Sequence, residues 1–146
     1  MRVDFYHLAA TPLERALPRI AERVVDGGGR LLVVAADEAL LARLDTHLWN
    51  FRPDSFLPHG LAGQAGEADQ PILLSTTTVP LNAARLIALV DGLWRDEALA
   101  FDRAFHFFDS VTIDAARTAW KGLAGRDGIE RHYWKQDEAG RWTEAG

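Results

Sequence analysis

The stretch RLLVVAADEALLARLDTHLW, residues 30–49, decides the fold because its hydrophobic period changes in the middle. Residues 30–36 are a continuous apolar run, which is typical of a strand buried on both faces of a parallel sheet. From residue 37 onward the apolar residues recur at the spacing of one helix face, so residues 37–49 predict an amphipathic helix. The leucines of that face are Leu40, Leu41, Leu44 and Leu48.

The segment before this stretch predicts another strand and another helix. RVDFYHL at 2–8 alternates β-branched and aromatic residues as a strand does. TPLE at 11–14 is a helix start in which Thr11 is the N-cap and Pro12 the first helical residue. The glycines at 27–29 end that helix. The order strand, helix, strand, helix implies a right-handed parallel unit, and hence an α/β sandwich of one domain.

One residue conflicts with the first helix. Pro18 lies in its interior, where the missing N–H leaves the carbonyl of Glu14 without a partner at a cost of about 3 kcal/mol. We therefore expect a kink or a short break in the helix at this position.

The rest of the chain predicts further elements of the same kinds. Strands are expected at 71–76, 84–92 and 101–109, and helices at 93–100 and 111–123. The tail alternates polar and aromatic residues about a D-E-A-G turn, which favours a small hairpin packed on the domain, or a loose end. We therefore divide the chain into a domain at 1–123 and a charged, aromatic extension at 124–146.

Composition and charge exclude several classes of function. The chain has 146 residues, a net charge of −5 and no cysteine, so thiolate catalysis and cysteine-ligated zinc are excluded. Proteins that grip nucleic acid by its phosphates usually present a basic face, so direct DNA or RNA binding is not expected. The N-terminus lacks the pattern of a signal peptide, and no apolar run is long enough to span a membrane. The sequence therefore predicts a cytoplasmic protein without membrane contact.

A fold of this kind often binds a dinucleotide, but the sequence argues against one. The phosphate-binding turn between the first strand and the first helix is glycine-rich, whereas this chain has HLAATPLE at 7–14. The five histidines share no metal-ligand spacing, and no G-x-S-x-G elbow marks a catalytic serine. We therefore expect no cofactor, no metal site and no catalytic residue.

Two segments remain as candidate binding surfaces. WNFRPDSFLPHGL at 49–61 holds two prolines that rule out a single helix, so it runs as turn and short strand. Its aromatic residues either cap the core or form an exposed patch for a partner. In the helix at 111–123, Arg117, Trp120 and Lys121 share one face. Two cations around an indole either receive a peptide with carboxylates and an aromatic residue or form a solvated helix face.

The order of these segments resembles the chi subunit of bacterial DNA polymerase III holoenzyme. The resemblance spans about residues 3–123, and its most specific block is DEALLARLDTHLWNFRPDSFLPHGLAG at 37–63. In that block LDxxLW is followed by SFxPHxLAG. The resemblance implies a non-catalytic accessory protein with a Rossmann-like fold, a three-layer sandwich with a mostly parallel sheet that binds no nucleotide.

The resemblance also implies partners. Chi proteins bind the psi subunit, which links them to the clamp loader. Trp49 and Phe56 match the residues of the psi-binding face, and Leu57 and Pro58 lie beside them. Some relatives are reported to use the same face for a helicase.

The second implied partner is the acidic C-terminal tail of single-stranded DNA-binding protein. The family pattern on a late helix falls on Arg117, Trp120 and Lys121. This chain has tryptophan where relatives have tyrosine, and Thr112 or Ile113 where they have a further lysine, which predicts a weaker or differently shaped pocket. Three cations of the tail either extend this site or face solvent: Arg126, Arg131 and Lys135.

Two other functions stay open. A small α/β enzyme could use His59 in the PHGLAG turn as acid or base, in which case His59→Ala would abolish that activity and leave partner binding largely intact. A helicase adaptor would use only the face at Trp49 and Phe56, and it would not bind the tail of single-stranded DNA-binding protein.

Overall fold

Strand β2 (Leu31–Val34) lies in the interior of the sheet, as its apolar sequence predicts. The computed structural model describes residues 1–51 and 57–145. All four residues of β2 are fully buried. The strand pairs in parallel with β4 (Ile72–Ser75) on one side and with β5 (Leu86–Leu89) on the other. A strand that is covered on both faces exposes no side to water, which is why its sequence is continuously apolar.

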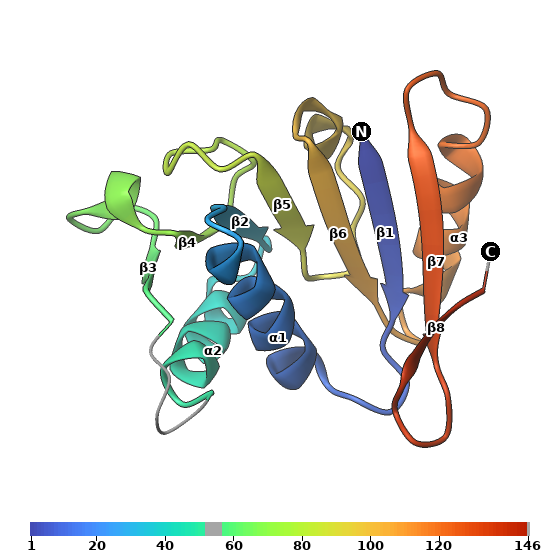
Figure 1. Cartoon of the computed structure of the whole chain (residues 1–146), viewed down its shortest axis with the longest axis horizontal. Helices are drawn as coiled ribbons and strands as arrows, with labels where there is room; N and C mark the ends of the chain where they lie inside the picture. The colour runs from blue at the N-terminus through green and yellow to red at the C-terminus, as the bar shows by residue number, and fades with distance from the viewer. Residues whose placement is uncertain (52–56, 146) are drawn as a thin grey trace.

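The described chain forms one eight-stranded sheet in the order β3-β4-β2-β5-β6-β1-β7-β8 (Figure 1). The other strands are β1 (Arg2–His7), β3 (His59–Leu61), β6 (Arg103–Phe108), β7 (Glu130–Gln136) and β8 (Trp142–Glu144). Neighbouring strands are parallel throughout, except that β7 and β8 are antiparallel. The predicted α/β fold with a mostly parallel sheet is therefore confirmed.

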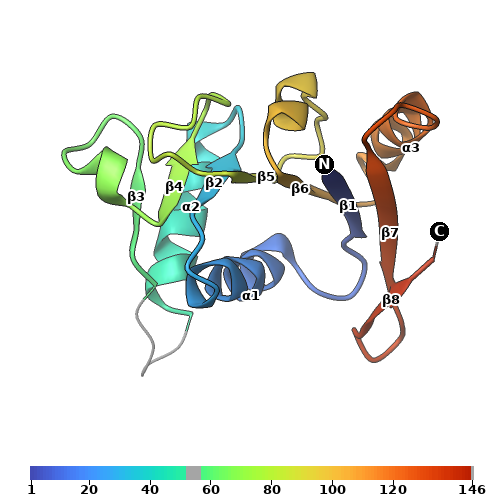
Figure 2. The ribbon, with the colours of Figure 1, turned by 45° about the horizontal axis from the view of Figure 1, so that its top comes forward.

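Helices cover both faces of the sheet, which makes the three layers that the sequence predicts (Figure 2). One face carries α1 (Leu13–Asp26) and α2 (Glu38–Trp49), and the other carries α3 (Ile113–Gly122) and the 3-10 helix η2 (Asp96–Ala100). Strand β6 shows the division, because Phe105 and Phe107 join the core under α1 and α2 while Ala104 and Phe108 join the core under α3. Alternate residues of a strand point to opposite faces, so one strand supplies both cores.

The first two strands are parallel but are not neighbours. Strands β5 and β6 lie between β1 and β2, so the connection through α1 passes two strands that come later in the chain. The order of strands along the sequence does not indicate this insertion. Its consequence is that the carboxyl end of β1 lies beside that of β6, far from β2.

Helix α1 differs from its prediction at two points. Its N-cap is Pro12 rather than Thr11, and no side chain caps it. The helix also runs without a break from Leu13 to Asp26 although Pro18 lies inside it. Pro18 is itself buried, as are the neighbouring apolar residues Ala16, Leu17, Ala21 and Val24. Burial of this face at about 25 cal/mol per Å² outweighs the one hydrogen bond that proline removes.

The segment at 93–100 and the tail also differ in part from their predictions. The helix expected at 93–100 is reduced to η2, a 3-10 helix, and a second short 3-10 helix, η1 (Glu67–Asp69), precedes β4. The tail forms the antiparallel pair β7 and β8, and β7 also pairs in parallel with β1 from Arg2 opposite Glu130 to Tyr6 opposite Trp134. The tail therefore adds two strands to the sheet.

A buried histidine stands out in the core beneath α3. His106 is fully buried, and neither ring nitrogen has a hydrogen-bond partner among the residues that the structure describes. The rings of Phe5, Trp94 and Phe108 surround it, with centroids 5.2, 5.6 and 6.1 Å away. Burial lowers the pKa of His106 to about 4, although the carboxylate of Asp91 acts in the opposite direction. The ring is therefore neutral at pH 7.

This histidine makes stability depend on pH. The folded-state pKa lies below the unfolded-state value of about 6.5, so protonation favours unfolding and stability is lost as the pH falls below 6.5, by about 3 kcal/mol at pH 4. We expect His106→Leu to remove most of that loss. Urea unfolding of both proteins at pH 7 and pH 4 measures it. Equal losses in the two proteins would contradict this role of His106.

Candidate partner-binding surfaces

The first candidate surface lies at the end of α2. Asp37 begins this helix by accepting a hydrogen bond from the backbone N–H of Ala39, 2.9 Å away. Leu48 near the other end is 1% exposed, whereas Trp49, the last helical residue, is 54% exposed. The edge of the Trp49 indole meets the ring of His59 with centroids 4.8 Å apart. A largely exposed indole that packs on a neighbouring ring is a typical anchor for a partner protein.

His59 joins the helix to the strand that follows. Its Nδ1 lies 2.6 Å from the carbonyl oxygen of Leu57, and its Nε2 lies 3.2 Å from the carbonyl oxygen of Asp45. The carboxylate of Asp45 is 3.1 Å from the same Nε2, and the His59 side chain is fully buried. Both nitrogens are thus occupied by the protein's own oxygens, so in this structure His59 braces the Trp49 indole and offers neither nitrogen to a substrate.

The other predicted residues of this surface have different positions. Pro58 is half-buried, whereas Leu57 is only 4% exposed and belongs to the core under α1 and α2. Leu57 therefore supports the surface from beneath and offers almost no area to a partner. Phe56 lies outside the described residues. We refer to Trp49 and Pro58 as the Trp49 surface.

The second candidate surface lies on α3, where the three predicted residues do share a face. Arg117 and Lys121 are exposed, and Trp120 is half-buried. Arg117 approaches Asp114 at 3.8 Å, with 64% and 95% of the two side chains exposed. Exposed pairs of this kind contribute little, so Arg117 can exchange Asp114 for a carboxylate of a partner.

The structure adds residues of β7 to this surface. The guanidinium of Arg131 lies 4.0 Å from the centre of the Trp120 ring and donates a hydrogen bond of 2.6 Å to the Trp120 carbonyl. The edges of Phe5 and Tyr133 meet the same indole at centroid distances of 5.3 and 5.6 Å. Of the three tail cations, Arg131 therefore lies against Trp120, whereas Arg126 is exposed on the outside of the molecule.

The resulting α3–β7 surface combines aromatic rings with positive charge. It consists of Arg117, Trp120, Lys121, Arg131, Tyr133 and Lys135. The pKa of the neighbouring His7 is lowered first by burial and then by the charges of Lys135 and Arg117, which places both cations close to one point. The alternation in RHYWK at 131–135 puts Arg131, Tyr133 and Lys135 on one side of a strand. That spacing is the signal by which sequence reasoning could have grouped them.

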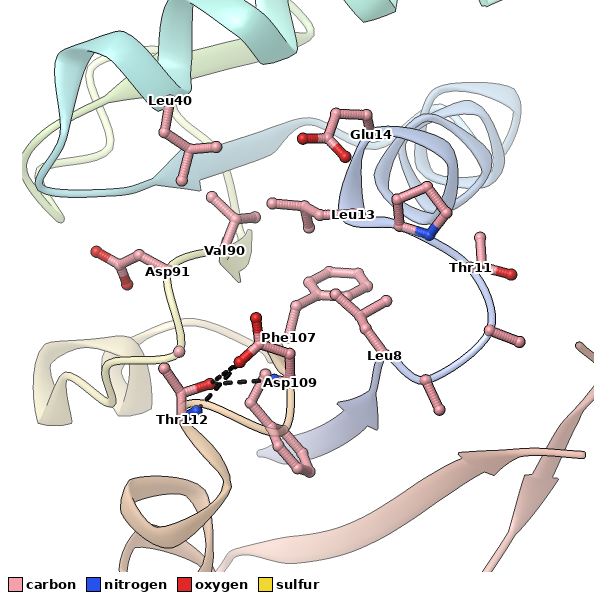
Figure 3. A pocket seen from close by; sticks show the side chains of 15 residues that line it. Leu8, Thr11, Leu13, Glu14, Leu40, Val90, Asp91, Phe107, Asp109 and Thr112 are labelled. Carbon is pink, nitrogen blue, oxygen red and sulfur yellow. Dashed lines mark hydrogen bonds between the residues drawn. The ribbon is translucent and has the colours of Figure 1, made fainter.

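A cleft of about 610 Å³ opens where a fold of this kind usually holds its ligand, outside the carboxyl ends of the strands (Figure 3). The apolar side chains Leu8, Leu13, Leu40, Val90 and Phe107 line it. Its charged lining residues are Glu14, Asp91 and Asp109, all acidic. The cleft is therefore unsuited to phosphate, and none of the predicted partner-binding residues that the structure describes lines it.

The backbone turn at this cleft is closed by a side chain from the tail. The backbone N–H groups of Ala9, Ala10 and Thr11 all donate to Oε1 of Gln136, at 3.1, 2.9 and 3.1 Å. The amide nitrogen of Gln136 donates to Thr11 Oγ1 and to the carbonyl oxygen of Gly140 at 2.7 and 3.1 Å. In nucleotide-binding relatives of this fold the corresponding turn aims its N–H groups at phosphate. In this protein the side-chain amide oxygen of Gln136 accepts the hydrogen bonds of these N–H groups.

Residues 1–51 and 57–145 hold neither a cluster of metal ligands nor a membrane-spanning helix. Within them no group of three or more histidine, aspartate or glutamate side chains could hold a metal ion. None of the helices found there is long and apolar enough to cross a membrane.

Comparison with known sequences identifies relatives. A profile of the family described as "DNA polymerase III chi subunit, HolC" matches residues 1–129. The DNA polymerase III subunit chi of Pseudomonas aeruginosa is 38% identical over 89 residues, which are 59% of this chain and 61% of that protein, less than two thirds of its length. The subunit of the same name from Escherichia coli is 35% identical over 113 residues, 75% of this chain and 76% of that protein.

Comparison with solved structures supports the fold alone. The chain is similar to the S. cerevisiae Dbp5 C-terminal domain, with a TM-score of 0.54, 12% sequence identity and coverage of 88% of each chain. At this identity the likeness concerns the arrangement of strands and helices and carries no functional information.

The contacts of Gln136 generate a prediction about the tail. Gln136→Met keeps the side-chain volume but removes every hydrogen bond, so we expect a loss of about 1–3 kcal/mol in the free energy of unfolding. Hydrogen exchange at the amides of Ala9, Ala10 and Thr11 should accelerate. Gln136→Glu keeps the acceptor oxygens and should retain the protection of these amides. Unchanged exchange in Gln136→Met would show that the turn does not depend on this side chain.

Proposed function

The chain belongs to the family of the DNA polymerase III chi subunit, and from this premise we propose that it bridges the psi subunit of the clamp loader and the acidic tail of single-stranded DNA-binding protein. As a family member it is an accessory subunit of the polymerase in DNA replication. We further propose that it acts in the cytoplasm, has no catalytic activity of its own, and carries residues 124–146 as an extension packed on the domain at 1–123.

One observation carries the proposal. The Trp49 surface adjoins β3 at one end of the sheet, whereas the α3–β7 surface adjoins β7 near the other end (Figure 1). Five strands of the sheet, β4, β2, β5, β6 and β1, lie between β3 and β7. Two partners can therefore bind at the same time without touching each other, which is what a bridging subunit requires.

The Trp49 surface suits a partner that supplies apolar contacts. Trp49 is exposed and braced by His59, so its indole loses little side-chain freedom on binding. Pro58 is half-buried beside this segment and has a fixed backbone. We assign psi to this surface, with Phe56 as a further contact, and a helicase that binds here would compete with psi.

The α3–β7 surface suits the carboxyl terminus of an acidic tail. Such a tail ends in a carboxylate next to an apolar side chain, so it needs cations beside an aromatic wall. Arg117 and Lys121 provide exposed charges, and Trp120 provides the wall with Arg131 held over its ring. This local positive charge lies on a chain whose net charge is −5, so the protein can serve replication through the DNA-coating protein without gripping phosphates.

Calorimetric titration with a peptide of the acidic tail tests this surface. We expect micromolar binding that weakens as salt is raised, and a loss of at least about tenfold in Arg117→Ala and in Lys121→Ala. Arg43→Ala removes an exposed arginine of α2 and serves as the matched control. Trp120→Ala should also abolish binding, but Trp120 packs on Phe5 and Tyr133, so its fold must be checked by circular dichroism. No binding by the folded wild type would remove this half of the proposal and favour a helicase adaptor.

Titration with psi tests the other surface. Trp49→Ala should weaken psi binding by about thirtyfold, the effect of losing a central aromatic anchor, and leave tail binding unchanged. Leu93→Ala is the matched control, because Leu93 is 50% exposed, close to the 54% of Trp49. Psi and the tail peptide should bind together with unchanged affinities. Competition between them would contradict the separation of the two surfaces.

A further inference from the structure

A third concave surface lies on the face of the sheet that carries α1 and α2. In Figure 2 these helices lie below the β3 to β5 end of the sheet, and β1 and β7 extend beyond them. A groove of about 570 Å³ runs between α1, β6, β1 and the β7–β8 hairpin. A neighbouring cavity of about 280 Å³ shares four of its lining residues, Tyr6, Ile20, Arg23 and Arg103, so the two adjoin each other. We refer to them together as the arginine groove.

The floor of the arginine groove is aromatic. Tyr6 stacks on Phe107 and on Trp134, with centroids 5.2 and 6.2 Å apart, and meets the edge of Trp142 at 5.2 Å. Tyr6 is 7% exposed, whereas Trp134 and Trp142 are half-buried. The two indoles therefore present apolar surface to whatever enters the groove.

The rim of the groove is positively charged. Arginines from three elements line it: Arg19 and Arg23 from α1, Arg103 from β6, and Arg141 from the turn of the hairpin. The described lining residues include no aspartate and no glutamate. Arg103 and Arg141 already pair with Asp4 at 2.8 Å and with Asp137 at 3.3 Å. Arg19 and Arg23 lie one helical turn apart, and neither side chain has a hydrogen bond or ion pair with a described residue.

The side chain of Arg103, which forms one side of the groove, is held in place by contacts within the protein. Asp4 is buried and accepts hydrogen bonds from Arg2, Arg103 and Trp134 Nε1 at 3.0, 2.8 and 2.9 Å. Burial raises the pKa of Asp4, but these hydrogen bonds lower it more, so the carboxylate is charged. It holds the guanidinium of Arg103 4.6 Å from the Phe105 ring centre. A preformed wall reduces the entropy that binding must overcome.

We propose that the arginine groove binds an acidic peptide segment of a partner protein, with one apolar side chain of the segment on Trp134 and Trp142 and its carboxylates on Arg19 and Arg23. The charges favour a peptide over nucleic acid. Arg19 and Arg23, which have no hydrogen bond or ion pair within the described part of the chain, match one or two carboxylates. A strand of nucleic acid instead brings a run of phosphates toward a chain of net charge −5. The groove lies on the other face of the sheet from α3, so it is independent of the proposed tail site.

The test uses capped peptides of ten residues, each with two to four aspartates around one phenylalanine, tryptophan or leucine. An amidated C-terminus removes the terminal carboxylate that the α3–β7 surface would recognise. Titration followed by ¹⁵N NMR should shift the indole signals of Trp134 and Trp142 and the backbone amides of α1. The double variant Arg19→Ala/Arg23→Ala should bind at least about tenfold more weakly, and the matched control Arg15→Ala/Arg43→Ala should bind like the wild type.

Three results would overturn the proposal. The first is no binding by any peptide of the set to the folded wild type. The second is equal binding by the two double variants, or shifts confined to α3. The third is tighter binding of a ten-nucleotide oligo(dT) than of any peptide, if the oligo(dT) binding also depends on Arg19 and Arg23. That result would make the groove a nucleic-acid site. Arg117→Ala changes the α3–β7 surface and leaves the arginine groove intact. Loss of peptide binding at the groove can therefore be told apart from loss of tail binding at the α3–β7 surface.

Discussion

A parallel sheet must be covered on both faces, and every other feature of this protein depends on how that requirement is met. The three α-helices of the described residues are too few to cover both faces of the eight strands. Helices α1 and α2 lie over one end of one face, whereas on the opposite face α3 lies over the other end and η2 lies near the middle, beside β6 (Figure 2). The part of the sheet face beside α1 is lined instead by aromatic side chains, among them Trp134 and Trp142, with arginines around them. The offset of the helices therefore leaves room for the arginine groove beside α1.

The tail has a structural role that follows from the same requirement. Without β7, strand β1 would lie at the edge of the sheet with unpaired backbone groups. The turn after β1 would also present three N–H groups without partners, and Gln136 accepts all three. In other proteins of this fold the N–H groups of this turn bind phosphate, whereas here they donate to the protein's own Gln136 side chain.

Local charge and overall charge act on different scales in this molecule. The net charge of −5 sets the long-range field and disfavours polyanions such as DNA. Within a few ångströms the arrangement of side chains dominates. On one face Arg131 lies over the Trp120 ring, with Arg117 and Lys121 on the same helix as Trp120, and on the other face Arg19 and Arg23 line the groove with the aromatic floor. Screening beyond about 10 Å at ordinary salt keeps these patches independent of the acidic remainder.

The α/β class, most of the helices and strands, and the family follow from the sequence. They do so because hydrophobic period reports how each segment is buried, as at 30–49, and because the motif at 37–63 is distinctive. The order of strands, the unbroken passage of α1 through Pro18 and the contact of Arg131 with Trp120 emerge only once the chain is folded. These depend on contacts such as Asp4 with Trp134 and Ala9 with Gln136, more than 120 residues apart. No local pattern encodes which distant segments meet, because that choice is made by packing the whole chain at once.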